Sequence, residues 1–191
     1  MFDATRSKFA DRLRRLLPRR VARRFVRQQD GAAAVEFALV AAPFLALTFA
    51  ILETAFVFFA GQTLEAAAAD SARLIMTGQA QSAAYTQANF KTAVCARIYA
   101  LFDCANGIYI DVKTFTSFSS ISATPPVTNG TLDTTKTSYN PGDVGDIVVV
   151  SLYYQWPIYV SMFSNNLASS NLNGGNRLLA ATAVFRVEPY H

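Results

Sequence analysis

Two residues at the start of a long apolar stretch, Gly31 and Glu36, have the residue types and spacing that could support chemistry. Gly31 lies where a basic segment meets the apolar stretch, and because it has no side chain its backbone is unhindered and extensible. Glu36 follows five positions later, among residues that are almost all uncharged. A carboxylate in an apolar membrane environment is costly unless a cation pairs with it. The two residues therefore indicate a backbone bond open to a protease and an acid that needs a positive partner.

The charge of the chain is concentrated at its N-terminal end. Residues 1–30 contain nine Arg and one Lys against three Asp, a charge of +7, so residues 31–191 carry −3 of the net +4. An Arg-rich arm can bind nucleic-acid phosphates. However, only Glu36 and Glu53 are charged in the whole segment 32–61 that follows. A basic flank beside an apolar run is typical of a membrane span, and we expect no nucleic-acid partner.

The apolar run is long enough to cross a bilayer as one helix. About 30 Å of hydrocarbon requires roughly 20 helical residues, which places the span at Ala32–Leu52 and Glu53 at its outer boundary. Lys and Arg near a span stay on the cytoplasmic side. Residues 1–30 are therefore expected inside the cell and the chain after about Gly61 outside it. The predicted topology is N-in and C-out, with the C-terminal part in the periplasm.

A simple secretory signal is the weaker interpretation of this segment, because the apolar stretch is long and has a carboxylate at its entrance. The Ala-rich tract Ala66–Ala69 nevertheless has the small residues of a signal peptidase site. Helix-forming composition continues past the span to Thr77 and Gly78, where we expect the helix to stop. Pro43 removes one hydrogen bond inside this helix, so a kink is expected there.

The sequence from Asp30, DGAAAVEFALVAAPFLALTF, resembles a type IV prepilin cleavage site, with Gly31 at the junction, Glu36 five positions on, and the aromatic Phe37 next to it. Over about 31–73 it looks like the TadE-like minor pilins, or pseudopilins, of Tad (Flp) pilus systems, whose apolar span also contains a proline. Phe37 stands where many Tad pilins have Tyr, which keeps the ring. The leader, residues 1–31, is long.

The resemblance implies a bacterial inner-membrane protein that prepilin peptidase cuts between Gly31 and Ala32. Cleavage would remove the basic leader and leave a cationic amine on Ala32, about 6 Å along the helix from Glu36. Glu36 would pair with this amine in a neighbouring subunit and so favour docking in register. A sister minor pilin and a polytopic platform protein are the other implied partners, and the product is implied to take part in a surface pilus. Alternatively, Glu36 is a lone interfacial carboxylate that contacts lipid headgroups or the arginines of the leader.

The rest of the helix carries side chains suited to lipid or to another helix. The small residues Ala41, Ala42 and Ala46 allow a second helix to approach closely. Glu53 and Glu65 are expected mainly to be solvated or interfacial, although Glu53 could contact a neighbouring pilin or the platform protein. Aromatic side chains expected to face lipid or gaps in a bundle are Phe44, Phe49, Phe56, Phe58 and Phe59.

After the leader (1–31) and the helix (32–78), residues 79–191 are expected to form a periplasmic domain, giving an α+β protein. Thr86–Phe102 has apolar residues at helical spacing and predicts a second helix. A small antiparallel sheet of three to four strands is predicted from segments rich in β-branched and aromatic residues. Those segments are Ile108–Phe118, Asp146–Trp156 and Leu178–Val187. The linkers 119–145 and 165–176 read as exposed loops, and Trp156–Phe163 as either a strand end with a turn or a short helix.

The only two cysteines, Cys95 and Cys104, both lie on the side assigned as external, where a disulfide can persist. On one continuous helix they would be about 13.5 Å apart, which a disulfide cannot reach. We favour a disulfide, which requires the helix to end between them. If it does not end, both are small buried apolar residues.

The sequence offers little for catalysis. His191 is the only histidine and lies at the C-terminus, and two cysteines are too few for a structural zinc site. The acidic segment with Asp143 and Asp146 favours a plain turn over a weak calcium site. We expect no enzymatic activity, no metal and no cofactor. Two other readings stay open: an uncleaved single-span envelope protein with a periplasmic binding domain, and an anchored hydrolase, which nothing beyond the existence of a domain supports.

Overall fold

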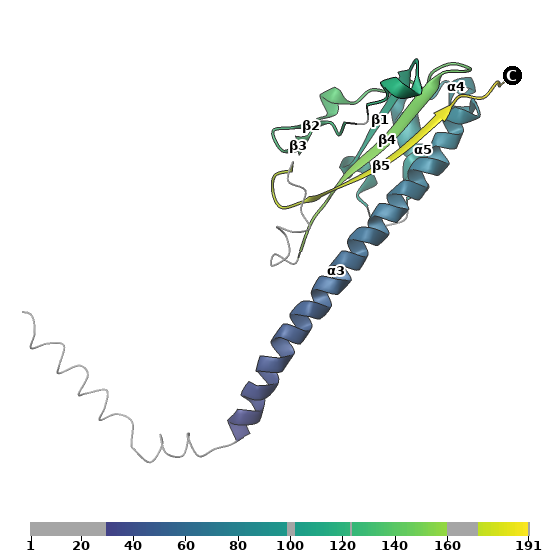
Figure 1. Ribbon diagram of the computed structural model, residues 1–191. Coiled ribbons are helices and arrows are strands. Elements are labelled where there is room, and N and C mark those ends of the chain that lie inside the picture. Colours follow the sequence, from purple (N-terminus) through teal and green to yellow (C-terminus); the bar gives the residue numbers. More distant parts are fainter. Residues whose placement is uncertain (1–29, 99–101, 123, 160–171, 191) are drawn as a thin grey trace, which may run out of the picture. The chain divides into compact units, whose positions relative to one another are not determined.

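The structure is a computed structural model that describes residues 30–98, 102–122, 124–159 and 172–190. The chain divides into two compact units, Met1–Thr48 and Phe49–His191. The first element that the structure describes is helix α3 (Asp30–Met76), whose first part belongs to one unit and whose second part belongs to the other (Figure 1). The fold is α+β, as predicted.

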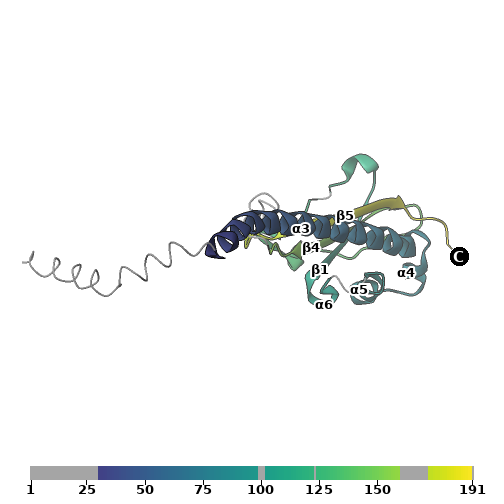
Figure 2. The same cartoon turned by 90° about the horizontal axis from the view of Figure 1, so that it is seen from below.

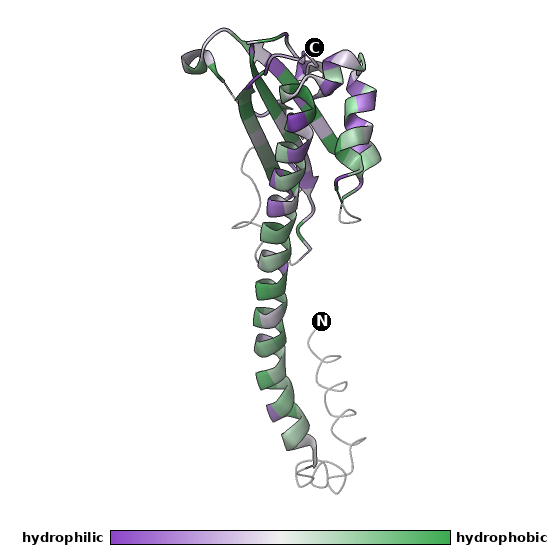
Figure 3. Cartoon of the chain, turned by 90° about the vertical axis from the view of Figure 1, so that its right-hand side faces the viewer, coloured by the Kyte–Doolittle hydropathy of each residue, from purple (hydrophilic) through white to green (hydrophobic). Residues whose placement is uncertain are grey.

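Helix α3 is a single helix of 47 residues, and it continues through Pro43. Most residues of its first part are hydrophobic (Figure 3), and the large ones among them, such as Phe37 and Leu39, are exposed. Among the described residues, α3 is the one helix long and apolar enough to cross a membrane. It ends at Met76, directly before the predicted stop. Gly78 then takes a φ of 75°, which favours glycine, and its N–H donates to the carbonyl of Ile75 at 3.0 Å.

The predicted antiparallel sheet is confirmed. Strands β1 (Ile108–Phe115), β4 (Ile147–Trp156) and β5 (Arg177–Arg186) form a three-stranded sheet in the order β1-β4-β5. Next to β1, Val112 makes a parallel bridge with Tyr139, through hydrogen bonds of 2.8 and 2.9 Å to Ser138 and Asn140. This bridge adds a short strand-like edge outside β1.

The part of α3 that lies in the second unit packs on one face of this sheet. Leu64 and Ile75 are fully buried there, in one cluster with Val112, Val150 and Leu152. The four alanines of α3 in that cluster, Ala60, Ala67, Ala68 and Ala72, allow the helix to approach the strands closely. Two of them, Ala67 and Ala68, belong to the tract that has signal-peptidase-like composition, and they are core residues of the domain.

Helix α5 (Gln87–Cys95) covers the same face of the sheet beside α3 (Figure 2). Thr86 caps its start, because its side chain accepts the Asn89 N–H while Asn89 accepts the Thr86 N–H. Phe90 and Val94 are fully buried in the shared core. The helix is shorter than the predicted Thr86–Phe102. Ile98 still packs against the core, whereas Leu101 lies outside the described residues.

Two short helices lie beside α5, namely α4 (Gln79–Ser82) and α6 (Cys104–Gly107). Cys95 ends α5, Cys104 begins α6, and the two residues form a disulfide with their Cα atoms 5.7 Å apart. The helix does end between the two cysteines, which a disulfide needs.

The expectation that 119–145 is an exposed loop is wrong in part, whereas the described residues of 165–176, namely 172–176, do form a loop. The first contains a hairpin, β2 (Val127–Thr128) and β3 (Thr131–Leu132), and the 3₁₀ turn η2 (Thr134–Lys136), while η1 (Phe118–Ser120) overlaps its start. Asn173 ties the second linker to this hairpin through bonds of 2.8 Å to Gly130 and 2.7 Å to Asn129. Leu132 and Leu172 are buried. Of the ambiguous stretch after Trp156, residues 157–159 are neither helix nor strand, and 160–163 lie outside the described residues.

The C-terminal segment after β5 packs against the C-terminal end of α3. The Glu188 N–H donates to the carbonyl of Met76 at 2.8 Å, one of the acceptors that a helix end leaves without a helical partner. The ring of Tyr190 lies against Gly78, where any added Cβ would clash with it. The last residues of the chain therefore help to terminate its first described helix.

The disulfide gives a stability prediction. Reducing Cys95–Cys104 should lower the free energy of unfolding of the detergent-solubilised chain by about 2–3 kcal/mol, because a short closed loop no longer restricts the unfolded state. The measurement is a urea titration with and without reductant. The double variant Cys95→Ser/Cys104→Ser is the control and should not respond to reductant. Equal stability of the oxidised and reduced chains would contradict the prediction.

Candidate functional site

The candidate site is the first part of α3, where Gly31, Ala32, Glu36 and Phe37 follow one another within two helical turns. All residues from 31 to 40 are exposed. A Cβ added at Gly31 would meet no described atom within 4 Å. The backbone around the bond between Gly31 and Ala32 is thus sterically open in the described part of the chain.

Glu36 is an exposed acid in an apolar surrounding. Its neighbours Val35 and Phe37 are 60% and 75% exposed, and Leu39 and Val40 are each 71% exposed. Within the described residues, no hydrogen bond or ion pair involves Glu36. A carboxylate on such a surface favours an external cation or hydrogen-bond donor, because apolar surroundings do not solvate its charge.

Glu53 does not match its expectation as a solvated or interfacial residue. Its exposed fraction is 7%, and its Oε1 accepts the backbone N–H of Tyr159 at 2.5 Å. The expectation was wrong because the sequence does not show that the segment after β4 returns to the helix at this level. Glu65 is exposed as expected, and its carboxylate accepts a hydrogen bond from Gln62 at 3.3 Å.

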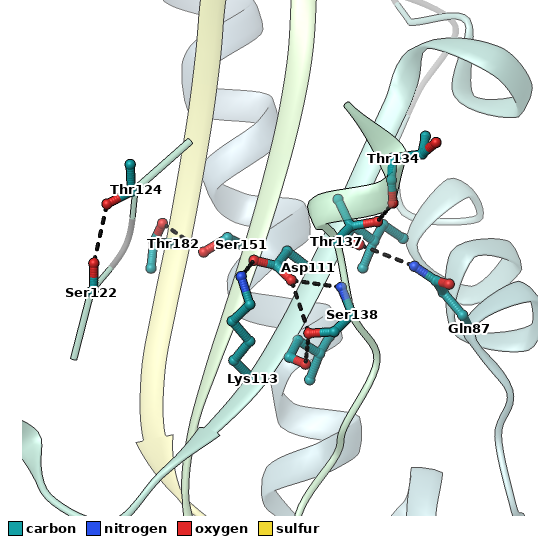
Figure 4. A network of polar contacts seen from close by, with 12 residues as sticks. Gln87, Asp111, Lys113, Ser122, Thr124, Thr134, Thr137, Ser138, Ser151 and Thr182 are labelled. Atoms are coloured by element: carbon teal, nitrogen blue, oxygen red, sulfur yellow. Dashed lines mark hydrogen bonds and ion pairs between the residues drawn. The ribbon is translucent and has the colours of Figure 1, made fainter. Parts of the chain in front are cut away.

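A polar cluster on the other face of the sheet was not anticipated from the sequence. Asp111, 5% exposed, accepts the Ser138 N–H at 2.8 Å and pairs with the Lys113 ammonium at 2.6 Å (Figure 4). On the same face, Ser151 and Thr182 are hydrogen-bonded at 3.2 Å. The alternation in IYIDVKTF could have placed Asp111 and Lys113 on one face. Both oxygens of Asp111 are engaged, so the cluster fastens the segment at Ser138 to β1.

Other polar groups of the domain also serve the fold. Hydrogen bonds from Thr135 and Thr128 hold the pKa of Asp133 below its usual value. Burial raises the pKa of Tyr139 to about 12, and the neighbouring Tyr85 adds to this shift. At the acidic turn, the Asp146 carboxylate accepts the Asp143 N–H at 2.9 Å. No three His, Cys, Asp or Glu side chains among the described residues are placed to hold a metal ion.

The domain has a half-open groove of about 400 Å³ beside the start of β1, next to α5 and η2. Two of its polar side chains already have partners, since Gln87 donates to the carbonyl of Ile110 at 3.2 Å and Lys91 to that of Ala105 at 2.8 Å. The groove therefore presents polar groups that hold the strand edge and the α6 turn in place.

Glu53 and Glu65 form a matched pair for testing the buried carboxylate. Glu53→Ala should lower the free energy of unfolding by about 1–3 kcal/mol, because it removes the acceptor of a hydrogen bond and leaves a donor without its partner. Glu65→Ala, on the exposed side of the same helix, should change it by less than about 0.5 kcal/mol. Urea unfolding in detergent measures both. Equal effects of the two substitutions would show that Glu53 is not held as described.

Comparison with known proteins identifies the segment that contains the candidate site. Residues 31–73 match the family model described as TadE-like protein, a match that covers most of α3 and leaves the rest of the domain outside it. This family is associated with Tad pilus assembly and is not a family of enzymes. Neither a curated protein nor a solved structure gave a match. The segment that carries Gly31, Glu36 and Phe37 is therefore similar to TadE-like proteins.

Proposed function

We propose that this chain is a minor pilin, or pseudopilin, that prepilin peptidase processes after Gly31 and that takes part in Tad (Flp) pilus assembly. The observation that carries the proposal is Glu36, an exposed carboxylate near the start of an apolar helix, with no partner among the described residues. Its proposed partner is the new N-terminal amine of a neighbouring subunit.

Processing would create the cation that Glu36 needs. Cleavage after Gly31 removes the leader with its excess of arginine and leaves Ala32 with a free amine, which is mostly protonated at neutral pH. An amine at the N-terminus of a helix lies at the positive end of the helix dipole and is itself stabilised by an anion. In an apolar environment, the amine and the carboxylate therefore each lower the free-energy cost of burying the other's charge.

The spacing along the helix would set the register between subunits. Ala32 and Glu36 are four residues apart, or about 6 Å along the axis. An amine that pairs with Glu36 of its neighbour therefore displaces one subunit by about 6 Å relative to the other. The small residues Ala41, Ala42 and Ala46 would let the two helices lie close enough for this contact.

The proposed setting is the bacterial inner membrane, with the N-terminus in the cytoplasm and the domain in the periplasm. The support is the single apolar helix together with the basic residues that precede it. The partners that this role requires are prepilin peptidase, a sister minor pilin and a polytopic platform protein.

Processing can be tested at its proposed position. In the native host, the mature protein should begin at Ala32 by intact-mass spectrometry. Gly31→Leu should abolish cleavage, because a branched side chain is added where the peptidase must bind an extended backbone. Gly61→Leu is the matched control. A Cβ added at Gly61 also meets nothing within 4 Å, and Gly61 lies outside the proposed cleavage site, so this variant should still be cut. An intact leader on the unaltered chain would favour an uncleaved envelope protein instead.

The role of Glu36 needs a separate variant. Glu36→Ala should leave membrane insertion and leader removal intact and reduce assembled pili at least tenfold, because the subunit loses the charge that pairs with its neighbour's amine. Insertion is measured by membrane fractionation and piliation by electron microscopy. Glu65→Ala, also an exposed acid on α3, should assemble normally. Normal piliation with Glu36→Ala would refute the pairing.

A further inference from the structure

The apolar exposed surface of α3 extends well past Leu52. Phe56, Phe58 and Phe59 are 56%, 70% and 57% exposed, and Glu53, which interrupts the uncharged run in the sequence, is turned inward and buried. No exposed charged side chain therefore interrupts the helix surface from Phe37 to Gly61. This stretch is about 37 Å long, roughly 7 Å more than the hydrocarbon core needs and close to the thickness of one headgroup layer.

The exposed phenylalanines spread over about half of the helix circumference. At 100° per residue, Phe56, Phe58 and Phe59 span an arc of about 160°. The opposite side belongs to the core, where Val57 and Ala60 are buried. Aromatic rings over so wide an arc suit a surrounding medium better than a single flat protein contact.

The end of β4 lies at the same level of the helix. The bond from the Tyr159 N–H to Glu53 holds the chain after β4 against α3, and the Tyr159 side chain is 79% exposed. Trp156 packs with Phe102 and Tyr154, with ring centroids 5.9 and 6.3 Å away. Trp and Tyr are the residues that membrane proteins enrich at the membrane–water interface, because each ring has an apolar body and a polar tip.

The charge at this end of the domain also suits a lipid surface. Arg177 stands opposite Trp156 in the sheet register and is exposed. Arginine is a residue type that interacts with lipid phosphates at a membrane surface. Glu53, the acid of α3 between Phe37 and Gly61, is buried.

We propose that the outer headgroup layer of the bilayer surrounds this end of the domain, so that the domain rests on the lipid surface. We call the five aromatic residues at this level the aromatic collar, namely Phe56, Phe58, Phe59, Trp156 and Tyr159. The membrane boundary then lies near Phe59 rather than at Glu53. This inference requires membrane anchoring by α3 and does not depend on leader cleavage or on pilus assembly.

Trp156 is the only tryptophan in the chain, so its fluorescence reports on the collar alone. The full chain is reconstituted in vesicles of phosphatidylcholine and phosphatidylglycerol that carry a nitroxide either at the headgroup or near the end of an acyl chain. The headgroup nitroxide should quench Trp156 at least about twofold more strongly than the deep one, because interfacial Trp lies at headgroup depth. Quenching by neither nitroxide, with full access to aqueous iodide, would overturn the proposal.

Variants separate a lipid contact from contact between copies. Phe58→Ser/Tyr159→Ser should at least halve headgroup quenching, while Phe118→Ser, an equally exposed aromatic at 59% in η1, should not change it. Near-ultraviolet circular dichroism checks that each variant is folded. Quenching that falls as the protein-to-lipid ratio rises would assign the collar to a second copy and overturn the lipid contact. Leader cleavage and piliation are measured separately, so failure here leaves the proposed function standing.

Discussion

A negative charge on an apolar helix must find a donor or a cation, and α3 meets this constraint in two different ways. Glu53 has an internal solution, because the segment after β4 returns to the helix and donates a backbone hydrogen bond to it. Glu36 has no such solution among the described residues. Glu53 therefore contributes to the fold of one chain, whereas Glu36 is available for contact with another molecule. This difference in partner, rather than any difference in residue type, separates the structural carboxylate from the one that we propose to be functional.

Helix α3 also combines two surfaces that require opposite side chains. Toward the sheet it uses small alanines together with Leu64 and Ile75, which pack closely against the strands. In its first part it exposes bulky apolar residues such as Phe37 and Leu39, which would be unfavourable in water. The same helix therefore combines a stretch that is apolar enough to cross a membrane with a core element, and the change from large exposed to small buried residues marks the transition.

The sequence was sufficient for features that depend on local pattern. The three strands, the antiparallel sheet and the end of α3 before Gly78 were predictable from β-branched runs and from a stop signal, which act over a few residues. Features that depend on distant contacts were not predictable. Glu53 is buried by a residue more than a hundred positions away, and the 119–145 linker folds because Asp111 and Asn173 bind it from other parts of the chain. The resemblance around Gly31 could be read because its signal lies in consecutive residues, while cleavage there stays a prediction. The exposure of Glu36 became visible only in the structure.

The closure of α3 by the C-terminal segment has a consequence for the timing of synthesis. β5, which pairs with one whole side of β4, and then Glu188 and Tyr190, which complete the end of α3, leave the ribosome after the rest of the described domain. The domain cannot attain its native core until these residues have been synthesised. Until then, the apolar faces of α3 and β4 must be kept from aggregating.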